Sequence, residues 1–350
     1  MNMLIIAAAL PLLIAPSDPQ EVEARPIARF EDADSIAPWR PNHDRVMGGV
    51  STGRPTWSDG AMRLTGELSL ENNGGFASFR WSPAAGLDLS EADGVRLRVR
   101  GDGRNWKVNL RTRQGRRGMS WQAPFMTSEA DTWQTVLLPF DAFEPSYRGR
   151  LVRTEEPIEL ARVATFGITV ADGQEGSYAL EVASIEAWSS GTEEPRAGSV
   201  AAREARTSAL AESLSEEPTA DVLIDALRDA ERVLVVAEPL SRGSYGKAAS
   251  IQLGRFMAEH EELVARDMRV VHLLGDRATL VAGRQLGPEA TKSLRSTWGL
   301  RADAFACALV GKDGGVKERW GELVPAAQVI APVDRMPMRR REARERSTSK

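Results

Sequence analysis

The sequence is poor in cysteine and histidine. Cys307 is the single cysteine among 350 residues, and only three histidines occur. One cysteine can form neither an intramolecular disulfide nor a cysteine-rich zinc cluster. The histidines, His43, His260 and His272, are scattered without ligand spacing. We therefore expect no disulfide framework, no metal site and no cofactor.

An excess of one charge sign is also missing. The formal net charge is -4, with 42% hydrophobic and 27% charged residues, which is typical of a soluble globular protein. A nearly neutral chain lacks the basic surface that nucleic-acid binding needs. The length allows two cores of ordinary domain size.

The only long apolar run is residues 1–15. It is too short for a transmembrane helix and suits the hydrophobic region of a signal peptide, with cleavage after Ala15 or after Ala24. We predict a signal peptide over residues 1–24 and an exported, periplasmic protein without a membrane span after processing. A retained N-terminal anchor is the alternative.

Residues 30–188 carry seven of the nine tryptophans and consist of short apolar segments between turn residues. In the segment 95–100, Val95, Leu97 and Val99 alternate with arginines, the pattern of a strand with one solvated face. Many short strands with frequent turn signals indicate an antiparallel sandwich or jelly roll.

Residues 189–219 are rich in Ser, Glu, Ala and Arg and read as a linker, partly helical over 200–214. From residue 221 to 338 helical and strand patterns alternate, and the continuous apolar run 233–237 is typical of a central buried strand. A βαβ unit, a helix and a hairpin predict a thioredoxin-like α/β domain. The arginine-rich end, 339–350, is expected to be a solvated tail.

Several motif blocks in the first module carry a family resemblance. They are His43-Asp44-Arg45-Val46-Met47-Gly48-Gly49-Val50-Ser51, the block 66–80, Val99-Arg100-Gly101-Asp102-Gly103-Arg104, and the block from Trp133 through Phe140 with Phe143 and Arg148-Gly149-Arg150. In this order they resemble the complex I (NADH:ubiquinone oxidoreductase) intermediate-associated family. The resemblance implies a galactose-binding-like jelly roll related to carbohydrate-binding modules. It also implies chaperone-like association with assembly intermediates of a respiratory complex.

The second module resembles an uncharacterised thioredoxin-like family, through the turn Gly311-Lys312-Asp313-Gly314-Gly315 and the ending Met336-Pro337-Met338-Arg339-Arg340. That family has no established activity. At the place of a redox Cys-x-x-Cys the chain has Ser241-Arg242-Gly243-Ser244, which excludes disulfide exchange. Cys307 falls inside a predicted strand, where a buried thiol is inert.

The polar residues of the motif blocks are candidate ligand- or partner-binding residues. Asp44, Arg45, Asp102 and Arg104 lie beside glycine turns, and Asn73 belongs to a segment that permits left-handed backbone. Such Asp and Arg residues form a binding rim or, more often, pin loops by charge-assisted hydrogen bonds.

Three tryptophans, Trp81, Trp106 and Trp121, are further candidates, as aromatic platforms for a sugar ring. The alternative is ordinary core packing.

The family resemblance and the fold that it implies suggest two functions. The first is a non-catalytic assembly or scaffold factor that binds a protein partner, such as an intermediate of a membrane complex. The second is an envelope carbohydrate-binding protein. Catalysis is disfavoured, because no nucleophile–base pair or carboxylate dyad stands out.

Overall fold

The computed structural model describes residues 23–113, 119–128, 132–152, 158–189, 200–215, 217–239, 247–273, 280–281 and 284–348. The predicted signal peptide therefore lies outside the described residues except for Glu23 and Ala24, and Ser241 to Ser244 lie outside them entirely. No described helix is both long and apolar enough to cross a bilayer.

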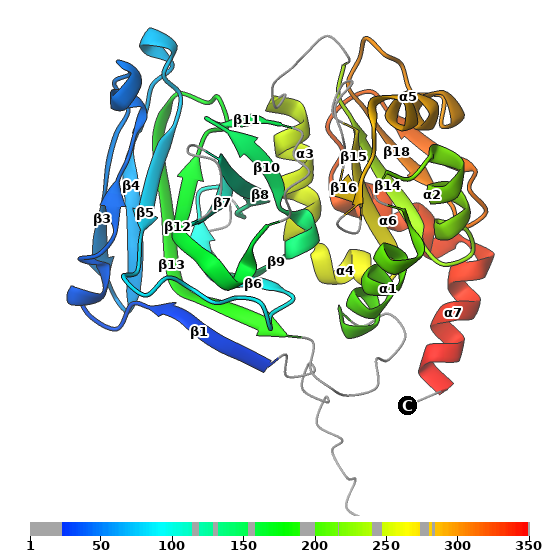
Figure 1. The fold of residues 1–350 in the computed structure, drawn as a ribbon, viewed down its shortest axis with the longest axis horizontal. Coiled ribbons are helices and arrows are strands. Elements are labelled where there is room, and N and C mark those ends of the chain that lie inside the picture. The colour runs from blue at the N-terminus through cyan, green and yellow to red at the C-terminus, as the bar shows by residue number, and fades with distance from the viewer. Residues whose placement is uncertain are drawn as a thin grey trace, which may run out of the picture.

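The first module is a sandwich of two antiparallel sheets (Figure 1). Sheet A has the order β3-β4-β13-β6-β9, with β1 also paired to β13. Its strands are β1 (Glu23–Arg29), β3 (Thr52–Ser58), β4 (Ala61–Leu68), β6 (Gly94–Gly101), β9 (Gln134–Pro139) and β13 (Gly176–Ser189). Because β1 pairs along residues 184–189 of β13, the module begins before the predicted residue 30.

Sheet B has the order β11-β10-β8-β7-β12-β5-β2. Its strands are β2 (Arg40–Pro41), β5 (Ala77–Trp81), β7 (Asn105–Thr112), β8 (Met119–Met126), β10 (Glu144–Tyr147), β11 (Arg150–Leu151) and β12 (Val163–Val170). Five 3-10 turns join the strands: η1 (Asp34–Ile36), η2 (Asp44–Met47), η3 (Glu71–Asn73), η4 (Phe140–Ala142) and η5 (Leu160–Arg162). The strand pairing confirms the predicted β-sandwich.

The alternation of side chains builds the core between the sheets. Val95, Leu97 and Val99 of β6 are fully buried, as predicted. The arginines between them face outward, and Arg96 and Arg100 pair with glutamates of the neighbouring β13. The same period of two buries alternate residues of β7 and leaves polar ones on the outer face of sheet B.

The second module is an α/β unit built on a four-stranded sheet of order β15-β14-β18-β19. Its strands are β14 (Arg232–Ala237), β15 (Met268–Leu273), β18 (Ala306–Val310) and β19 (Val316–Trp320), beside a separate pair of short strands, β16 (Leu280–Val281) and β17 (Arg284–Gln285). The helices are α2 (Ala220–Leu227), α3 (Lys247–Ala258), α4 (His260–Val264), α5 (Pro288–Thr297) and α6 (Ala326–Arg335). Every residue of β14 is buried, as expected of a central strand.

The two modules share one core. Buried apolar side chains form a single cluster from Ala123 and Phe125 of β8, through Leu253 and Phe256 of α3, to Val236 of β14. Figure 1 shows α3 between sheet B and the second sheet. Gly254 permits this close packing, because a Cβ there would lie 2.1 Å from Asn105 Oδ1. The modules are therefore packed against each other as one body.

Two segments pack more closely than their sequences suggested. The linker is partly helical as predicted, and Leu210 of its helix, α1 (Val200–Ser213), joins the second core. The predicted tail, 339–350, lies mostly within α7 (Pro337–Thr348); its described side chains are largely exposed, but ion pairs hold the helix against the second module. Glu342 lies 3.1 Å from Arg232 and Arg346 lies 2.7 Å from Asp267. Tertiary charge pairing, rather than an apolar face, orders this arginine-rich helix.

Candidate partner-binding surface

A buried carboxylate organises the loop of the first motif block. Asp44 begins η2 and is inaccessible to solvent. Its carboxylate accepts hydrogen bonds from the Ser51 backbone N–H at 3.0 Å, the Ser51 hydroxyl at 2.5 Å and the Gly75 N–H at 2.7 Å. Burial opposes its ionisation, but these hydrogen bonds outweigh burial and lower the pKa of Asp44. One side chain therefore ties residues 44–51 to residues 69–76.

In each loop one position must be glycine, because the chain passes close to this carboxylate. A Cβ on Gly49 would lie 2.4 Å from Asp44 Cγ, and one on Gly74 would lie 2.6 Å from Asp44 Oδ2. Neither position has room for a side chain. Packing around Asp44 thus explains one glycine in each of the two motif blocks.

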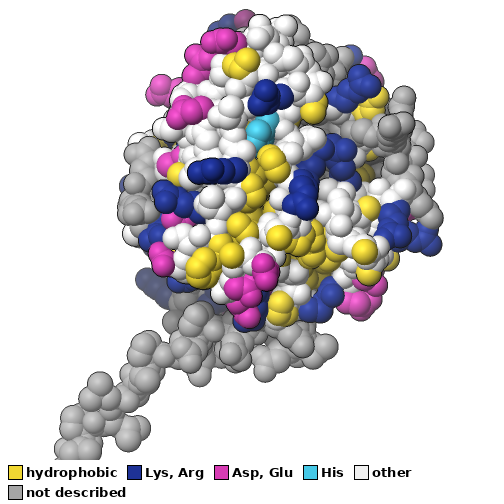
Figure 2. All heavy atoms as spheres, turned by 90° about the vertical axis from the view of Figure 1, so that its left-hand side faces the viewer, with side chains coloured by type: hydrophobic (Ala, Val, Ile, Leu, Met, Phe, Trp, Pro, Cys, Tyr) yellow, Lys and Arg dark blue, Asp and Glu magenta, His cyan; other side chains and the backbone are white. Residues whose placement is uncertain are grey.

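The rigid loop presents apolar side chains to solvent. Val46 is 70% exposed and Met47 62% exposed, with Val50 and Leu70 more than 40% exposed. Figure 2, which looks onto the side of the molecule where β3 and β4 lie, shows apolar side chains gathered among charged ones. An apolar group held outward on a fixed backbone is typical of a protein contact site. We call Val46, Met47, Val50 and Leu70 the apolar loop surface.

A charged groove adjoins the apolar loop surface. The Leu70 N–H donates to Glu175 Oε1 at 2.9 Å, and Glu175 lines a groove of about 650 Å³. Arg63, Glu67 and Asp102 also line it. Apolar contacts beside charges of both signs suit a protein partner, because the charges fix orientation while the apolar groups supply binding free energy.

Most of the predicted polar residues, namely Asp44, Asp102 and Arg104, hold loops in place through hydrogen bonds or ion pairs. Arg104 is buried and makes a two-pronged ion pair with Asp172, with bonds of 3.0 and 2.7 Å. Asp102 accepts from the Ala179 N–H at 2.7 Å. Arg45 and Asn73 are exposed near the apolar loop surface, and Asn73 has a left-handed φ of 58°. Asp44 and Arg104 thus position loops rather than reach a ligand.

The tryptophan candidates do not form a sugar platform together. Trp106 is fully buried and Trp121 is 7% exposed, so both belong to the core. Trp81 is half-buried and stacks on Trp39, with ring centroids 6.1 Å apart. Trp106 and Trp121 are therefore removed from the candidates, because neither ring face is open to solvent.

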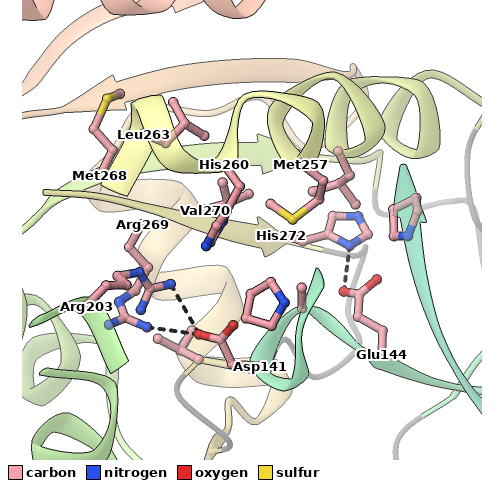
Figure 3. Close-up of a pocket in the computed structure, with 15 residues that line it drawn as sticks. Asp141, Glu144, Arg203, Met257, His260, Leu263, Met268, Arg269, Val270 and His272 are labelled. Atoms are coloured by element: carbon pink, nitrogen blue, oxygen red, sulfur yellow. Dashed lines mark hydrogen bonds and ion pairs between the residues drawn. The ribbon is translucent and has the colours of Figure 1, made fainter. Parts of the chain in front are cut away.

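A small cavity lies between the modules (Figure 3). It measures about 60 Å³ and is lined by η4 and β10 of the first module and by α1, α3, α4 and β15 of the second. Asp141 lies 3.2 Å from Arg203 and 3.4 Å from Arg269, and these guanidinium groups outweigh burial to lower the pKa of Asp141. Burial, with Arg203 nearby, lowers the pKa of His260 to about 4, so this imidazole is neutral.

A second charged contact crosses the same interface. His272 Nδ1 lies 2.8 Å from Glu144 of the first module and Nε2 lies 3.1 Å from Glu238. Burial opposes its charge, but the two carboxylates raise the pKa of His272 to about 10. Burial lowers the pKa of the nearby Lys107 ammonium to about 8. The cations Lys107 and His272 therefore lie near the carboxylates of Glu144 and Glu238. Their charges balance only when the two modules are packed together.

Sequence reasoning missed this interface. Glu144 and His272 are 128 residues apart, so no local pattern links them.

Among the described residues no group of three or more His, Cys, Asp or Glu side chains is arranged to hold a metal. Cys307 is buried in β18, and burial raises the pKa of its thiol to about 12. The ionisable groups at the interface are engaged with one another, an arrangement that stabilises docking.

Comparison with known families divides the chain at the same place as the structure. Residues 28–182 match the family model of Complex I intermediate-associated protein 30, and residues 223–342 match a domain of unknown function, DUF4174. The first module therefore carries a domain of the complex I intermediate-associated family, and the second carries the uncharacterised domain.

Each of the following curated relatives matches less than half of the chain. Complex I intermediate-associated protein 30 of Mus musculus is 29% identical over 179 residues, 46% of this chain and 55% of that protein. The Drosophila melanogaster protein of that name is 30% identical over 130 residues, 35% of this chain and 43% of that protein. The human sushi repeat-containing protein SRPX is 31% identical over 127 residues, 35% of this chain and 27% of that protein. The chain thus spans about half the length, or less, of these curated relatives.

Solved structures resemble the chain more distantly. A family 11 carbohydrate-binding module of Clostridium thermocellum is 14% identical, with a TM-score of 0.38, and the match covers 49% of this chain and 98% of that one. The agarase AgWH50C is 12% identical, with a TM-score of 0.37, over 60% of this chain and 35% of that one. The strand pairing of sheets A and B establishes the sandwich without these neighbours.

Proposed function

We propose that the protein is a non-catalytic binding protein that acts as a chaperone-like assembly or scaffold factor. Its partner is a protein, and the partner class is an intermediate of a membrane complex. The mouse and fruit-fly relatives, named for association with complex I intermediates, support this partner class. The docking site is the apolar loop surface with the adjoining charged groove.

The exposure of Val46 and Met47 on a loop held by Asp44 is the observation that carries the proposal. Burying apolar side chains contributes about 25 cal/mol per Å². A loop that is already fixed loses little conformational entropy on binding. Val46 and Met47 point to solvent, and the buried Asp44 carboxylate fixes the loop that carries them. This arrangement is typical of a protein-binding surface.

The second module and the compartment complete the proposal. We infer that residues 221–338 form a thioredoxin-like domain without redox chemistry; its order of βαβ, helix and hairpin supports this. It stiffens the jelly roll through the shared core. We also infer export to the periplasm, as the apolar residues 1–15 suggest. Mass spectrometry of the mature N-terminus tests export, and an intact Met1 would contradict it.

Carbohydrate binding is the second candidate function. Its support is the outer face of sheet B, where Asn109, Thr165 and Thr169 offer neutral hydrogen-bonding groups on β7 and β12. A glycan array distinguishes the two. Saturable sugar binding that persists after the apolar loop surface is altered would favour this candidate over the first.

A double variant, Val46→Glu with Met47→Glu, tests the partner surface. The matched control is Val222→Glu with Met338→Glu, which adds the same charge at residues that are 47% and 39% exposed on the second module. Both variants are checked for unchanged thermal midpoints. We expect wild type and control to co-purify with membrane-complex subunits identified by mass spectrometry, and the loop variant to lose them. Equal capture by all three would reject the proposed surface.

A further inference from the structure

The C-terminal helix α7 concentrates positive charge. Residues 335–346 contain six arginines and two glutamates, a net charge of +4 in a chain whose net charge is -4. Arg335 ends α6, and the other five arginines belong to α7. Figure 1 shows α7 along the edge of the second module, on the side of the molecule away from β3 and β4. A slightly acidic protein with one basic helix presents unlike surfaces to charged partners.

One face of α7 is fixed to the second module. Glu342 lies 2.9 Å from Lys312 and 3.1 Å from Arg232, and Arg346 lies 2.7 Å from Asp267. Burial opposes the ionisation of Glu342, but Lys312 and Arg232 outweigh burial and lower the pKa of this carboxyl. Since residues 342 and 346 are four positions apart, they share a face, and this face holds the helix in place.

The opposite face of α7 is formed by Arg340, Arg341 and Arg344. A helix turns by about 100° per residue, so Arg344 lies about 200° from both Glu342 and Arg346. All three arginines are exposed. Among the described residues, no ion pair or side-chain hydrogen bond involves Arg340 or Arg341. The helix is therefore held by one face and presents guanidinium groups on the other.

The outward arginines are unfavourable for the helix by itself. Arg340 and Arg344 are four residues apart, and like charges at this spacing destabilise a helix. Glu345, which is also exposed, offsets at most one of the three charges. An anionic surface opposite this face would remove the repulsion, because each guanidinium group would then face a charge of the other sign.

The composition of α7 favours a lipid surface over a polymeric partner. The helix contains no aromatic residue, whereas proteins that bind single-stranded nucleic acid stack its bases on aromatic side chains. It also has no apolar stripe for a protein groove to bury. Lipid headgroups diffuse laterally, so they gather beneath exposed arginines without a fixed complementary shape. A partner in a membrane complex, as proposed above, would also bring a bilayer near.

We propose that the outward face of α7 docks on the anionic phospholipid headgroups of a bilayer. Each arginine near such a surface strengthens binding about fivefold, so the three together contribute about a hundredfold. The contact is weak and reversible, and it adds to the contact that the apolar loop surface makes with a partner in the same membrane. The choice of lipid rests partly on that membrane partner, whereas the test below does not depend on it.

Sedimentation with sucrose-loaded vesicles tests the docking face. The vesicles contain phosphatidylcholine alone or phosphatidylcholine with about 30% phosphatidylglycerol, which is anionic. The site variant combines Arg340→Gln, Arg341→Gln and Arg344→Gln. The matched control removes the same charge from exposed positions on β3, on η5 and next to α2, through Arg54→Gln, Arg162→Gln and Arg228→Gln. Both variants are first checked for the thermal midpoint of the wild type.

We expect wild type to bind the anionic vesicles at low ionic strength and the neutral vesicles at least about tenfold more weakly. The site variant should lose about a hundredfold, and the control should stay within about twofold. Raising the ionic strength to about 1 M should release the protein, because the Debye length falls to about 3 Å. Glu345→Gln should strengthen binding to the anionic vesicles, a gain that a folding defect does not produce.

Three results would overturn the proposal: no binding to the anionic vesicles, equal binding to both kinds of vesicle, or equal binding by the site variant and the control. Binding to oligo(dT) or polyglutamate without binding to vesicles would also overturn it and would identify a polymeric partner. The partner surface is tested separately, because capture of membrane-complex subunits from detergent extracts needs no bilayer. That capture should be unchanged in the site variant, so the two proposals fail independently.

Discussion

The Asp44 carboxylate accepts a hydrogen bond from the Ser51 backbone N–H at 3.0 Å, which closes the first motif loop on itself. The same carboxylate reaches Gly75 at 2.7 Å on a second loop. Val46 and Met47 lie between the two ends of the closed loop, and so their outward position follows from Asp44.

Replacing Asp44 by alanine should destabilise the first module by about 2–4 kcal/mol, because three buried donors lose their acceptor. Urea unfolding of the whole chain measures the change. Asp34→Ala, an exposed residue in η1, is the control and should change stability by less than about 0.5 kcal/mol. Similar losses in both variants would contradict the role of Asp44 as the centre of the loops.

Replacing His272 by glutamine should be costly, because Glu144 and Glu238 would keep their buried charges without the imidazolium. We expect a loss of about 3–5 kcal/mol. His260→Gln is the matched comparison at the same interface. It exchanges a neutral ring for a neutral amide and should lose about 1 kcal/mol. A larger loss at His260 than at His272 would show that the assigned charge states are reversed.

The same interface predicts how stability depends on pH. The pKa of His272 rises from 6.5 to about 10 on folding, so its contribution is fully present below pH 6.5 and is lost as the pH rises toward 10. The pKa of Lys107 falls from 10.5 to about 8, so folding gains stability from this residue between pH 8 and 10.5. Unfolding free energy should therefore fall from pH 6.5 to 8 and then level off. In Lys107→Met the fall should continue to pH 10.

Urea unfolding across this range, compared with His272→Gln, isolates the effect from other titrating groups. The variant should lose the slope between pH 6.5 and 8. An unchanged slope in the variant would exclude His272 as its source.

Gly254→Leu should separate α3 from sheet B, because even a Cβ there would lie 2.1 Å from Asn105 Oδ1 and 3.3 Å from the Phe125 carbonyl carbon. We expect destabilisation of about 1–3 kcal/mol and faster hydrogen exchange in β7 and β8. Gly321→Leu is the control, since a Cβ there has no neighbour within 4 Å. Unchanged exchange in the Gly254 variant would contradict the shared core.

Local patterns predicted strand β6 and the central strand β14 correctly, because alternation and apolar runs record burial directly. The alternation in β7 also agrees with the burial of Trp106, since this residue shares a face with the buried Val108 and Leu110. The helix at the C-terminal end of the second module could not be predicted in this way. Helix α7 has no apolar stripe, and its order comes from partners such as Arg232, about a hundred residues away.

The candidate site was likewise predicted only in part. The motif blocks pointed to Asp44 and its loops, yet which residues turn outward depends on hydrogen bonds that only the fold brings together. The contacts of Glu144 with His272 and of Asp141 with Arg203 join segments from different modules. Charge pairing at such distances leaves no periodic signal in one sequence.

The most direct test of the partner surface places a photo-crosslinking amino acid at position 47 and, as the comparison, at position 338. Met47 is 62% exposed on the motif loop and Met338 is 39% exposed on the second module. Irradiation of cells should give a crosslink from position 47 to a subunit of a membrane complex, and Val46→Glu should abolish it. A crosslink to that subunit from position 338 alone would contradict the assignment of the motif loop as the docking surface.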